Sequence, residues 1–373
     1  GRQRKKQIMT AQQTQIEINL PNLRNNLSFL RSKLNSKTMI MAVVKAFSYG
    51  ADSKIISKEL ELQNIDYLAV AYLDEGIELR ESGIKTPILV LHPQLNDFDK
   101  IFKYELEPSI YSFRILKEFT TSIVRHSKKN YPFQIKFNTG LNRLGFTQDD
   151  INDLIFFLKK LRPNFLFSHL GASEDSQEAS FTLNQIIKFN KICSDFENKI
   201  GDTFKKHILN TSGVLNYSKY QFDMVRCGIG LYGFGNESKY AEVLKPVLSL
   251  KTVISQINTI KEGESVGYNK GFVASRPTKS ATLPIGHADG ISRLYGKGKG
   301  KVFINGAFAK IIGNVCMDMV MVDVTDIECQ EGDQVIVFDD TTFSAQEFAS
   351  TIETISYEIL TALSTRIKRI VIN

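Results

Sequence analysis

The sequence has few of the features that mark metal-binding, secreted or membrane proteins. Its four cysteines stand far apart in the chain, and none forms a CxxC pair. No HExxH motif and no cysteine–histidine cluster is present, so we expect no metal site. No apolar run approaches the roughly 18 residues of a membrane span, and the start of the chain shows no signal-peptide core. Free thiols without a signal sequence favour a protein of the reducing cytoplasm.

Positive charge is concentrated at the start of the chain. The formal net charge is +7, and Arg2, Arg4, Lys5 and Lys6 carry much of it. The remaining sequence has a small basic excess and no basic stripe, so we expect no nucleic-acid partner. We interpret residues 1–13 as a flexible basic arm or linker.

The body of the chain predicts an α/β barrel. Hydrophobic residues make up 42% of the 373 residues, which is enough to bury a large core. Eight short, apolar, β-rich runs recur: Met39–Val44, Tyr67–Ala71, Ile88–His92, Leu106–Ile110, Phe133–Phe137, Phe165–His169, His207–Leu209 and Met224–Arg226. Helical patterns separate most of them, which predicts a (β/α)8 TIM barrel over residues 14–245. An open, doubly wound sheet of the same units is the alternative.

Local signals mark several helix ends in this region. Asp52 and Asp74 are candidate N-caps. The apolar face that begins at Ile151 is expected to continue to Leu161 and to end at Pro163, and Gly201 is a candidate C-terminal glycine after a second amphipathic helix.

The predicted secondary structure changes after about residue 245. Strand patterns dominate, beginning with 248–260, and turn signals separate them. Asn305-Gly306 predicts a type I′ hairpin between two of these strands. Residues 246–373 are therefore predicted to form a C-terminal, mainly-β domain.

The ends of the barrel strands carry the candidate chemistry. In this fold, reactive side chains gather at the carboxyl ends of the strands. Lys45, His169 and Arg226 occupy such positions, and the small residues around Ser212 and 228–230 are suited to binding a phosphate. A lysine beside a phosphate cradle, with Arg and His nearby, indicates pyridoxal phosphate. Taken alone, Lys45 is better explained as a lysine that extends from the barrel mouth into solvent.

A second motif favours a different cofactor. Residues 228–233 match GxGxxG, but a dinucleotide site needs a helix to begin there and an acidic residue about 20 positions later. Lys245-Pro246 and a β-rich region follow instead, so we give the nicotinamide interpretation little weight.

Nine motifs in order make the chain similar to the alanine racemases, a family of fold-type III pyridoxal-phosphate enzymes. They are Ala42–Gly50, Lys136–Gly145, Ser168–Leu170, Asn210–Ser212, Asp223–Gly233, Gly267-Tyr268, Leu283–Gly290, Gly313–Asp318 and Ser356–Glu358. The resemblance covers nearly the whole chain, from Ile16 to its end.

The resemblance implies a racemase with two bases. Lys45 would hold pyridoxal 5′-phosphate covalently and act on one face of the substrate Cα. Tyr268 of the other subunit in a homodimer would act on the opposite face. Arg143 and the backbone of Met317 would bind the carboxylate of alanine.

The resemblance also implies how the cofactor is held. Its phosphate would be bound by Tyr49, Tyr357, Ser212 and the backbone of Gly228 and Ile229, and Asn210 belongs to the same cofactor site. His169 would lie beside the ring, and Arg226 would approach the pyridine nitrogen. We interpret His92, His126 and His207 as structural or surface residues.

Three positions around the substrate need separate comment. Lys136 corresponds to a lysine that is carbamylated in many relatives and orients the residue matching Arg143, and we favour the same modification here. Asn138 stands where aspartate is common. His287 replaces a usual tyrosine at the substrate entrance, where Asp318 is kept.

The resemblance implies a cytoplasmic enzyme that supplies D-alanine for peptidoglycan. Some bacterial relatives are fused behind a cell-wall ligase, and the basic arm is interpreted as the linker of such a fusion. The alternatives are a related amino-acid racemase, a decarboxylase on the same plan and a non-catalytic pyridoxal-phosphate carrier. The carrier would lack the C-terminal domain that holds Tyr268.

Overall fold

The computed structural model describes residues 13–235 and 237–373, so the predicted arm lies almost wholly outside the described residues. The chain divides into two compact units. One comprises residues 24–48 and 52–244, and the other comprises residues up to 23, 49–51 and 245–373. No helix in the described ranges is long and apolar enough to cross a membrane.

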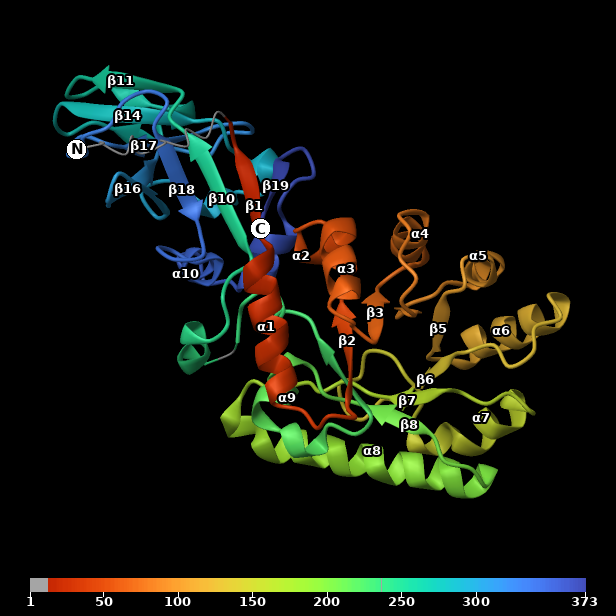
Figure 1. Cartoon of the computed structure of the whole chain (residues 1–373). Coiled ribbons are helices and arrows are strands. Elements are labelled where there is room, and N and C mark those ends of the chain that lie inside the picture. Colours follow the sequence, from red (N-terminus) through yellow and green to blue (C-terminus); the bar gives the residue numbers. More distant parts are fainter. Residues whose placement is uncertain (1–12, 236) are drawn as a thin grey trace, which may run out of the picture. The chain divides into compact units, whose positions relative to one another are not determined.

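The first unit is a closed barrel of eight parallel strands, which confirms the predicted fold class and excludes the open sheet (Figure 1). Its strands are β2 (Met39–Val43), β3 (Tyr67–Val70), β4 (Ile88–Val90), β5 (Glu107–Ile110), β6 (Gln134–Lys136), β7 (Phe165–Phe167), β8 (Lys205–His207) and β9 (Met224–Cys227). Seven of the eight predicted apolar runs contain most of a strand, because these strands are buried between the barrel interior and a helix layer. The run His207–Leu209 overlaps β8 only at His207, because β8 begins two residues earlier at the exposed Lys205.

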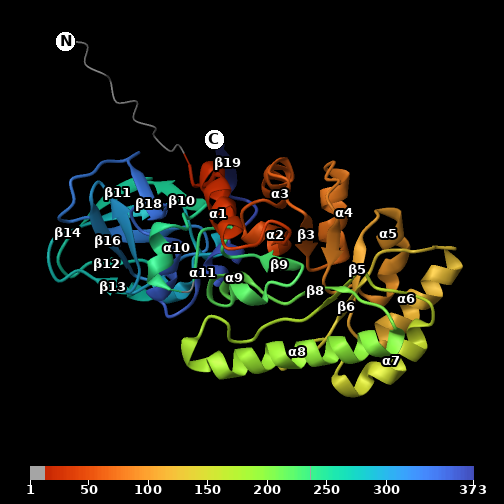
Figure 2. The same ribbon diagram turned by 60° about the horizontal axis from the view of Figure 1, so that its bottom comes forward.

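Helices alternate with these strands. They are α1 (Leu20–Ser32), α2 (Lys45–Tyr49), α3 (Ser53–Leu62), α4 (Leu73–Glu81), α5 (Phe98–Lys103), α6 (Phe113–Arg125), α7 (Ile151–Leu158), α8 (Ala179–Ile200) and α9 (Thr211–Asn216). The 22-residue α8 is drawn in green beside the barrel strands in Figure 2. It ends at Gly201 with a φ of 79°, as the sequence predicted.

Two predicted helix ends differ from the structure, and one is confirmed. Asp52 caps α3 by accepting from the backbone N–H groups of residues 54 and 55. Asp74 is not a cap, because α4 begins one residue earlier and Glu75 accepts from the N–H of Tyr72 instead. The helix α7 ends at Leu158, well before the predicted stop, where the next residue takes a φ of 54°.

The second unit is built on a nine-stranded sheet with the order β11-β14-β17-β16-β15-β18-β10-β1-β19. Its strands are β1 (Gln15–Asn19), β10 (Leu248–Val253), β11 (Gln256–Ile260), β14 (Thr278–Leu283), β15 (Lys301–Ile304), β16 (Ala307–Ile312), β17 (Val320–Asp323), β18 (Gln334–Phe338) and β19 (Lys368–Ile372). A small sheet pairs β12 (Ser265–Val266) with β13 (Phe272–Val273), and the unit's helices are α10 (Ala345–Ser350) and α11 (Ser356–Thr361).

Three details of this unit bear on the sequence predictions. The hairpin between β15 and β16 turns at Asn305-Gly306, where both residues have positive φ, as predicted. The run 248–260 is not one strand, because β10 pairs with β18 and β1 whereas β11 pairs with β14. The N-terminal β1, which falls within the range predicted for the barrel, instead lies between β10 and β19 in the second unit.

Gly50 allows a close backbone approach inside the second unit. Its φ is +80°, and a Cβ built there would overlap the carbonyl oxygen of Leu360 in α11. The neighbouring Tyr49 ring lies 6.0 Å from that of Tyr357, which is also in α11. Only glycine combines this φ with the available space.

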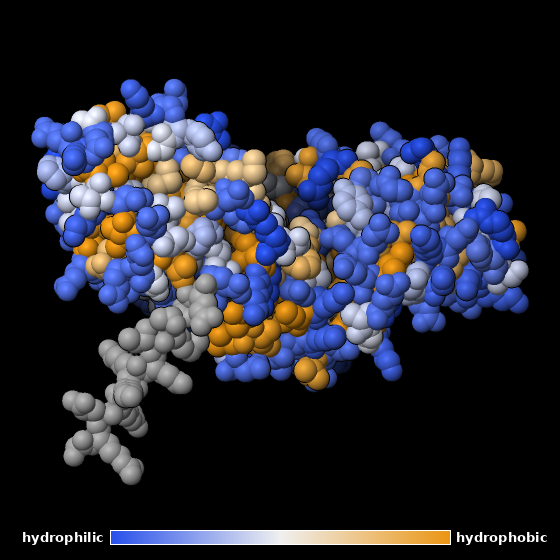
Figure 3. Space-filling view, turned by 90° about the horizontal axis from the view of Figure 1, so that it is seen from above, coloured by the Kyte–Doolittle hydropathy of each residue, from blue (hydrophilic) through white to orange (hydrophobic). Residues whose placement is uncertain are grey.

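The surface is mostly hydrophilic on the face drawn in Figure 3, and hydrophobic residues form smaller patches among the polar ones. In the second unit, exposed apolar side chains include Tyr268, Met317 and Met319. Large exposed apolar residues that gather in one place are typical of interaction or ligand sites.

We expect Gly50→Ala to destabilise the protein more than its backbone conformation alone would explain. Gly263→Ala in the same unit is the matched control, because Gly263 has a φ of +87° and no atom near its virtual Cβ. The control should lower the free energy of unfolding by about 1–2 kcal/mol. Gly50→Ala should lose at least about 2 kcal/mol more, since backbone must move. Denaturant unfolding measures both, and equal losses would contradict the close-approach argument.

Candidate active site

Lys45 lies just beyond the end of β2, at the carboxyl end of the barrel strands. Its side chain is half-buried. Burial lowers the pKa of its ammonium group, and the charges of Arg143 and Arg226 lower it further, whereas Glu75 opposes them. The neutral amine, which is the nucleophilic form of a lysine, is therefore more populated at Lys45 than at a lysine on the surface.

The chain after Lys45 takes a left-handed helical turn. Ala46, Phe47 and Ser48 have φ between 53° and 55°, which costs roughly 1–2 kcal/mol for each such residue. Within the barrel unit, Glu75 Oε2 accepts from the Ala46 N–H at 2.7 Å. The Ser48 hydroxyl bonds to the phenol of Tyr232 at 2.5 Å. The surrounding residues thus hold a strained turn in place, and Lys45 at its start is held with it.

Sequence reasoning missed Glu75. It is the one carboxylate in the described part of the chain that acts on the pKa of Lys45, and it also binds the turn after it. A glutamate in the first turn of α4 was the available signal, because that position commonly bonds back to the N-cap backbone.

Four cationic side chains act on one another at the barrel mouth: Lys45, Lys136, Arg143 and Arg226. Lys136 is buried at the end of β6. Burial lowers its pKa to about 7, and the charges of Arg226, Arg143 and Lys45 contribute in the same direction. A substantial fraction of Lys136 is therefore deprotonated near neutral pH, which is unusual for a lysine.

Arg226 is buried in β9 and surrounded by acceptors. Its Nη2 donates to the carbonyl oxygen of Ser168 at 2.7 Å and to Nδ1 of His169 at 3.0 Å. Its Nη1 donates to Nδ1 of His207. Burial and the charge of Arg226 both hold the pKa of each histidine well below its usual value, so both rings are neutral and carry their proton on Nε2.

The predicted phosphate-binding residues of the barrel lie around the start of α9 and the turn after β9. Asn210 caps α9 by accepting from the Gly213 N–H at 2.9 Å. Ser212 and Ile229 are buried. The Thr211 hydroxyl accepts from the N–H of Gly228 at 3.3 Å and of residue 230 at 3.2 Å, which ties the two segments together.

The GxGxxG segment does not open a helix. Residues 228–233 form successive tight turns, so the geometry of a dinucleotide site is absent from this described segment.

The barrel mouth fits pyridoxal 5′-phosphate. It offers a lysine with a lowered pKa for covalent attachment and an arginine locked beside a neutral histidine. Small buried residues sit where the cradle was expected. Among the described residues that act on the pKa of Lys45, Glu75 is the only acid, so an anionic cofactor would offset the positive charge around Lys45.

The remaining predicted residues belong to the second unit. Tyr268, Met317 and Asp318 line one cavity of about 350 Å³, together with Gly267, Cys316, Met319 and Met321. Tyr268 is 73% exposed. His287 is also exposed, and its backbone N–H donates to the Cys316 carbonyl at 2.9 Å, next to Met317. Asp318 forms an ion pair with Arg366 at 2.9 Å.

The structure therefore gathers the predicted residues into two groups. Lys45, Lys136, Arg143, His169, Asn210, Ser212, Arg226, Gly228 and Ile229 belong to the barrel unit, whereas Tyr49, Tyr268, His287, Met317, Asp318 and Tyr357 belong to the second unit. In the second group, Tyr49 lies beside Tyr357, and Tyr268 lies with Met317 and Asp318.

Two family models match the chain. The alanine racemase N-terminal domain matches residues 18–235, and the alanine racemase C-terminal domain matches residues 247–371. The alanine racemase of Clostridium tetani is 36% identical over 370 residues, which covers 95% of this chain and 94% of that protein.

Solved structures agree with these matches. An alanine racemase of Clostridium difficile 630 superposes with a TM-score of 0.89 at 31% identity, covering 96% of this chain and 95% of its own. An alanine racemase of Bartonella henselae with covalently bound pyridoxal phosphate superposes with a TM-score of 0.88 at 28% identity, covering 96% and 99%. The chain therefore belongs to the alanine racemase family of pyridoxal-phosphate-dependent amino-acid racemases.

Proposed function

We propose that this chain interconverts L- and D-alanine with two bases, Lys45 and the Tyr268 of a second copy in a homodimer. The observation that carries the proposal is the lysine with a lowered pKa at the barrel mouth, in a setting that fits the cofactor. When bound, pyridoxal 5′-phosphate draws electrons from the substrate Cα and makes its proton acidic. Racemisation then needs a proton removed from one face and another delivered to the opposite face. One fixed base does not reach both faces.

Tyr268 supplies the second base in this proposal. It is 73% exposed in its own chain and lies in a cavity with exposed Met317 and Met319, which supports its use by another copy. A free phenol has a pKa of about 10 and is a weak base. A nearby guanidinium such as that of Arg143 would favour the phenolate and improve the base.

The other residues bind and orient. Arg143 and the backbone of Met317 would bind the substrate carboxylate, and Arg226 would donate toward the pyridine nitrogen, with His169 beside the ring. The phosphate would be held by Tyr49, Tyr357, Ser212 and the backbone of Gly228 and Ile229, and Asn210 would belong to the same cofactor site. His287 and Asp318 would line the substrate entrance, and the ion pair of Asp318 with Arg366 supports an ordered position there.

Arg226 would also limit side reactions. It stays a cation at neutral pH and donates to each of its histidine neighbours, so it disfavours a proton on the pyridine nitrogen. A neutral ring nitrogen is a weaker electron sink, which reduces competing chemistry such as transamination.

Lys136 is proposed to carry a carbamate that orients Arg143. Its pKa of about 7 supports this, because only the neutral amine reacts with carbon dioxide. A buried ammonium beside arginines is costly, and conversion to an anion removes that cost.

The cellular setting is part of the proposal. All four cysteines are free, two of them buried, which is consistent with a reducing compartment. We propose that the enzyme works in the cytoplasm and supplies D-alanine for peptidoglycan, as the family resemblance implies.

Lys45→Ala should abolish both racemisation and the visible absorbance of covalently held cofactor. The reason is that no other amine replaces the attachment point and first base. Lys37→Ala, at an exposed lysine before β2, is the matched control and should behave as wild type. Absorbance before and after borohydride reduction measures the attachment, and a borohydride-trapped cofactor in Lys45→Ala would remove Lys45 from this role.

L-Alanine incubated in D₂O with the wild-type enzyme should lose its optical rotation and gain deuterium at Cα. Tyr268→Phe should slow inversion by about 10²–10⁴-fold, the usual contribution of a positioned base. Exchange in one enantiomer should persist, because Lys45 remains. Tyr72→Phe, at an exposed tyrosine of the barrel, is the control. Inversion at the wild-type rate in Tyr268→Phe would refute the two-base mechanism, and carbon dioxide release by the wild type would indicate a decarboxylase.

Protein equilibrated with ¹³C-bicarbonate should show a carbamate signal by NMR that Lys136→Ala lacks. The signal should be strong above a pH of about 7 and weaken below it, since protonation at the lowered pKa of Lys136 removes the reacting amine. Acetate should partly restore the activity of Lys136→Ala by replacing the carbamate charge. A wild-type protein with no Lys136-dependent signal at any pH would refute the modification.

A further inference from the structure

A continuous row of hydrogen bonds crosses the interior of the barrel and ends on Arg226. Glu107 Oε1 accepts from Gln134 Nε2 at 3.1 Å. Gln134 Oε1 contacts His207 Nε2 at 2.7 Å, and His207 Nδ1 accepts from Arg226 Nη1. All four residues are 5% exposed or less. We call Glu107, Gln134, His207 and Arg226 the polar ladder.

The donors and acceptors of the polar ladder match in only one direction along the row. An ionised carboxylate accepts and does not donate, so Glu107 requires the amide nitrogen of Gln134 to face it. The amide oxygen then faces His207, which must place its proton on Nε2 to donate. That leaves the lone pair of Nδ1 for Arg226. The orientation of Gln134 therefore selects the tautomer of His207, and Glu107 selects the orientation of Gln134.

Three donors converge on the same oxygen of Glu107. Besides Gln134, the phenol of Tyr67 donates at 3.3 Å, and Asn164 Nδ2 also donates. Burial raises the pKa of Glu107, and these three hydrogen bonds oppose that rise. The donor set thus favours the ionised form on which the ladder depends.

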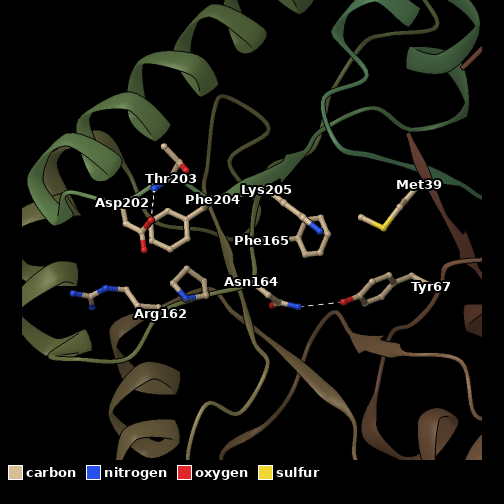
Figure 4. A pocket seen from close by; sticks show the side chains of 10 residues that line it. Met39, Tyr67, Arg162, Asn164, Phe165, Asp202, Thr203, Phe204 and Lys205 are labelled. Carbon is tan, nitrogen blue, oxygen red and sulfur yellow. Dashed lines mark hydrogen bonds between the residues drawn. The ribbon is translucent and has the colours of Figure 1, made fainter. Parts of the chain in front are cut away.

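The ladder runs from one end of the barrel to the other. Glu107 and Gln134 are the first residues of β5 and β6, whereas the mouth lies at the carboxyl ends of the strands. Tyr67 and Asn164 line a cavity of about 390 Å³ whose wall is formed by the starts of strands such as β3 and β8 (Figure 4). Glu107 does not line it, so these two side chains separate the carboxylate from that cavity.

The middle of the ladder is held rigidly. The ring of His207 stacks on that of Phe167 with centroids 4.6 Å apart and an angle of 12°. The ring plane therefore does not adjust if the tautomer changes, and a proton on Nδ1 would point at Arg226. Two donors facing each other in a buried site are repulsive, so the wrong tautomer would displace the guanidinium.

We propose that Glu107, acting through Gln134 and His207, is a positioning residue that fixes Arg226 for its contact with the cofactor. The role of Arg226 at the pyridine nitrogen rests on the proposed function, whereas the effect of Glu107 on His207 does not. Glu107 is buried at the first residue of β5, at the opposite end of the strands from the mouth, and its action is carried by the orientation of the ladder.

The test compares three near-isosteric variants by ¹⁵N-histidine NMR of the cofactor-loaded enzyme without substrate. Wild type should show His207 as a single neutral tautomer with the proton on Nε2. Glu107→Gln should give a mixture, because an amide at 107 accepts either orientation of Gln134. Gln134→Leu should also release His207. Tyr67→Phe is the matched control, since it removes another donor to Glu107 but leaves the link to Gln134, and it should keep the wild-type tautomer.

Kinetics supply a second measurement. Glu107→Gln should lower kcat roughly 10-fold, the loss expected when a hydrogen bond to a charged group is weakened. Its KM should stay near that of wild type, because Arg143 is untouched. The double variant Glu107→Gln/Gln134→Leu should be no worse than Gln134→Leu alone, since both act through one path. Circular dichroism and thermal unfolding confirm that each variant is folded.

The outcomes separate the two proposals. A single, unchanged His207 tautomer in folded Glu107→Gln overturns the ladder, and so do additive kinetic losses in the double variant. A wild type that fails to racemise alanine overturns the proposed function, while a tautomer change in Glu107→Gln would still support the coupling of Glu107 to His207.

Discussion

Crowded positive charge at the mouth of the barrel is the constraint on which the site depends. Lys45, Lys136, Arg143 and Arg226 act on one another in a partly buried space, where water screens their repulsion poorly. The repulsion and the burial together depress the pKa values of both lysines. The same conditions keep His169 and His207 neutral, which makes them acceptors for Arg226. An anionic cofactor and a carboxylate substrate are the natural partners of such a site.

The protein stabilises these cations mainly with neutral hydrogen-bond acceptors and uses few carboxylates. Arg226 bonds to a backbone carbonyl and to two ring nitrogens. Two glutamates act at different places around this site. Glu75 holds the strained turn after Lys45, and Glu107 sets the direction of the polar ladder. Precise placement of a few acids leaves the mouth positive enough to bind phosphate and substrate while keeping its groups ordered.

The division of the chain into two units bears directly on the proposed chemistry. Lys45 belongs to the barrel, and Tyr268 belongs to the β unit, where it is widely exposed in a single chain. In the proposed mechanism, this exposure leaves Tyr268 accessible to another copy of the chain. A dimer therefore offers a simple way to place two bases on opposite faces of one carbon.

The sequence alone determined the barrel and the hairpin at Asn305, since these follow from periodic burial and turn chemistry, and it placed Lys45 at the end of a barrel strand. It did not reveal that β1 joins the C-terminal sheet, because strand partners far apart in the chain leave no local signal. It also left His207 as an ordinary structural or surface residue and passed over Glu75, Glu107 and Gln134. Only the tertiary structure brings these side chains into hydrogen-bonding distance inside the barrel, and the chemistry of a buried polar group is set by the partners that folding places around it.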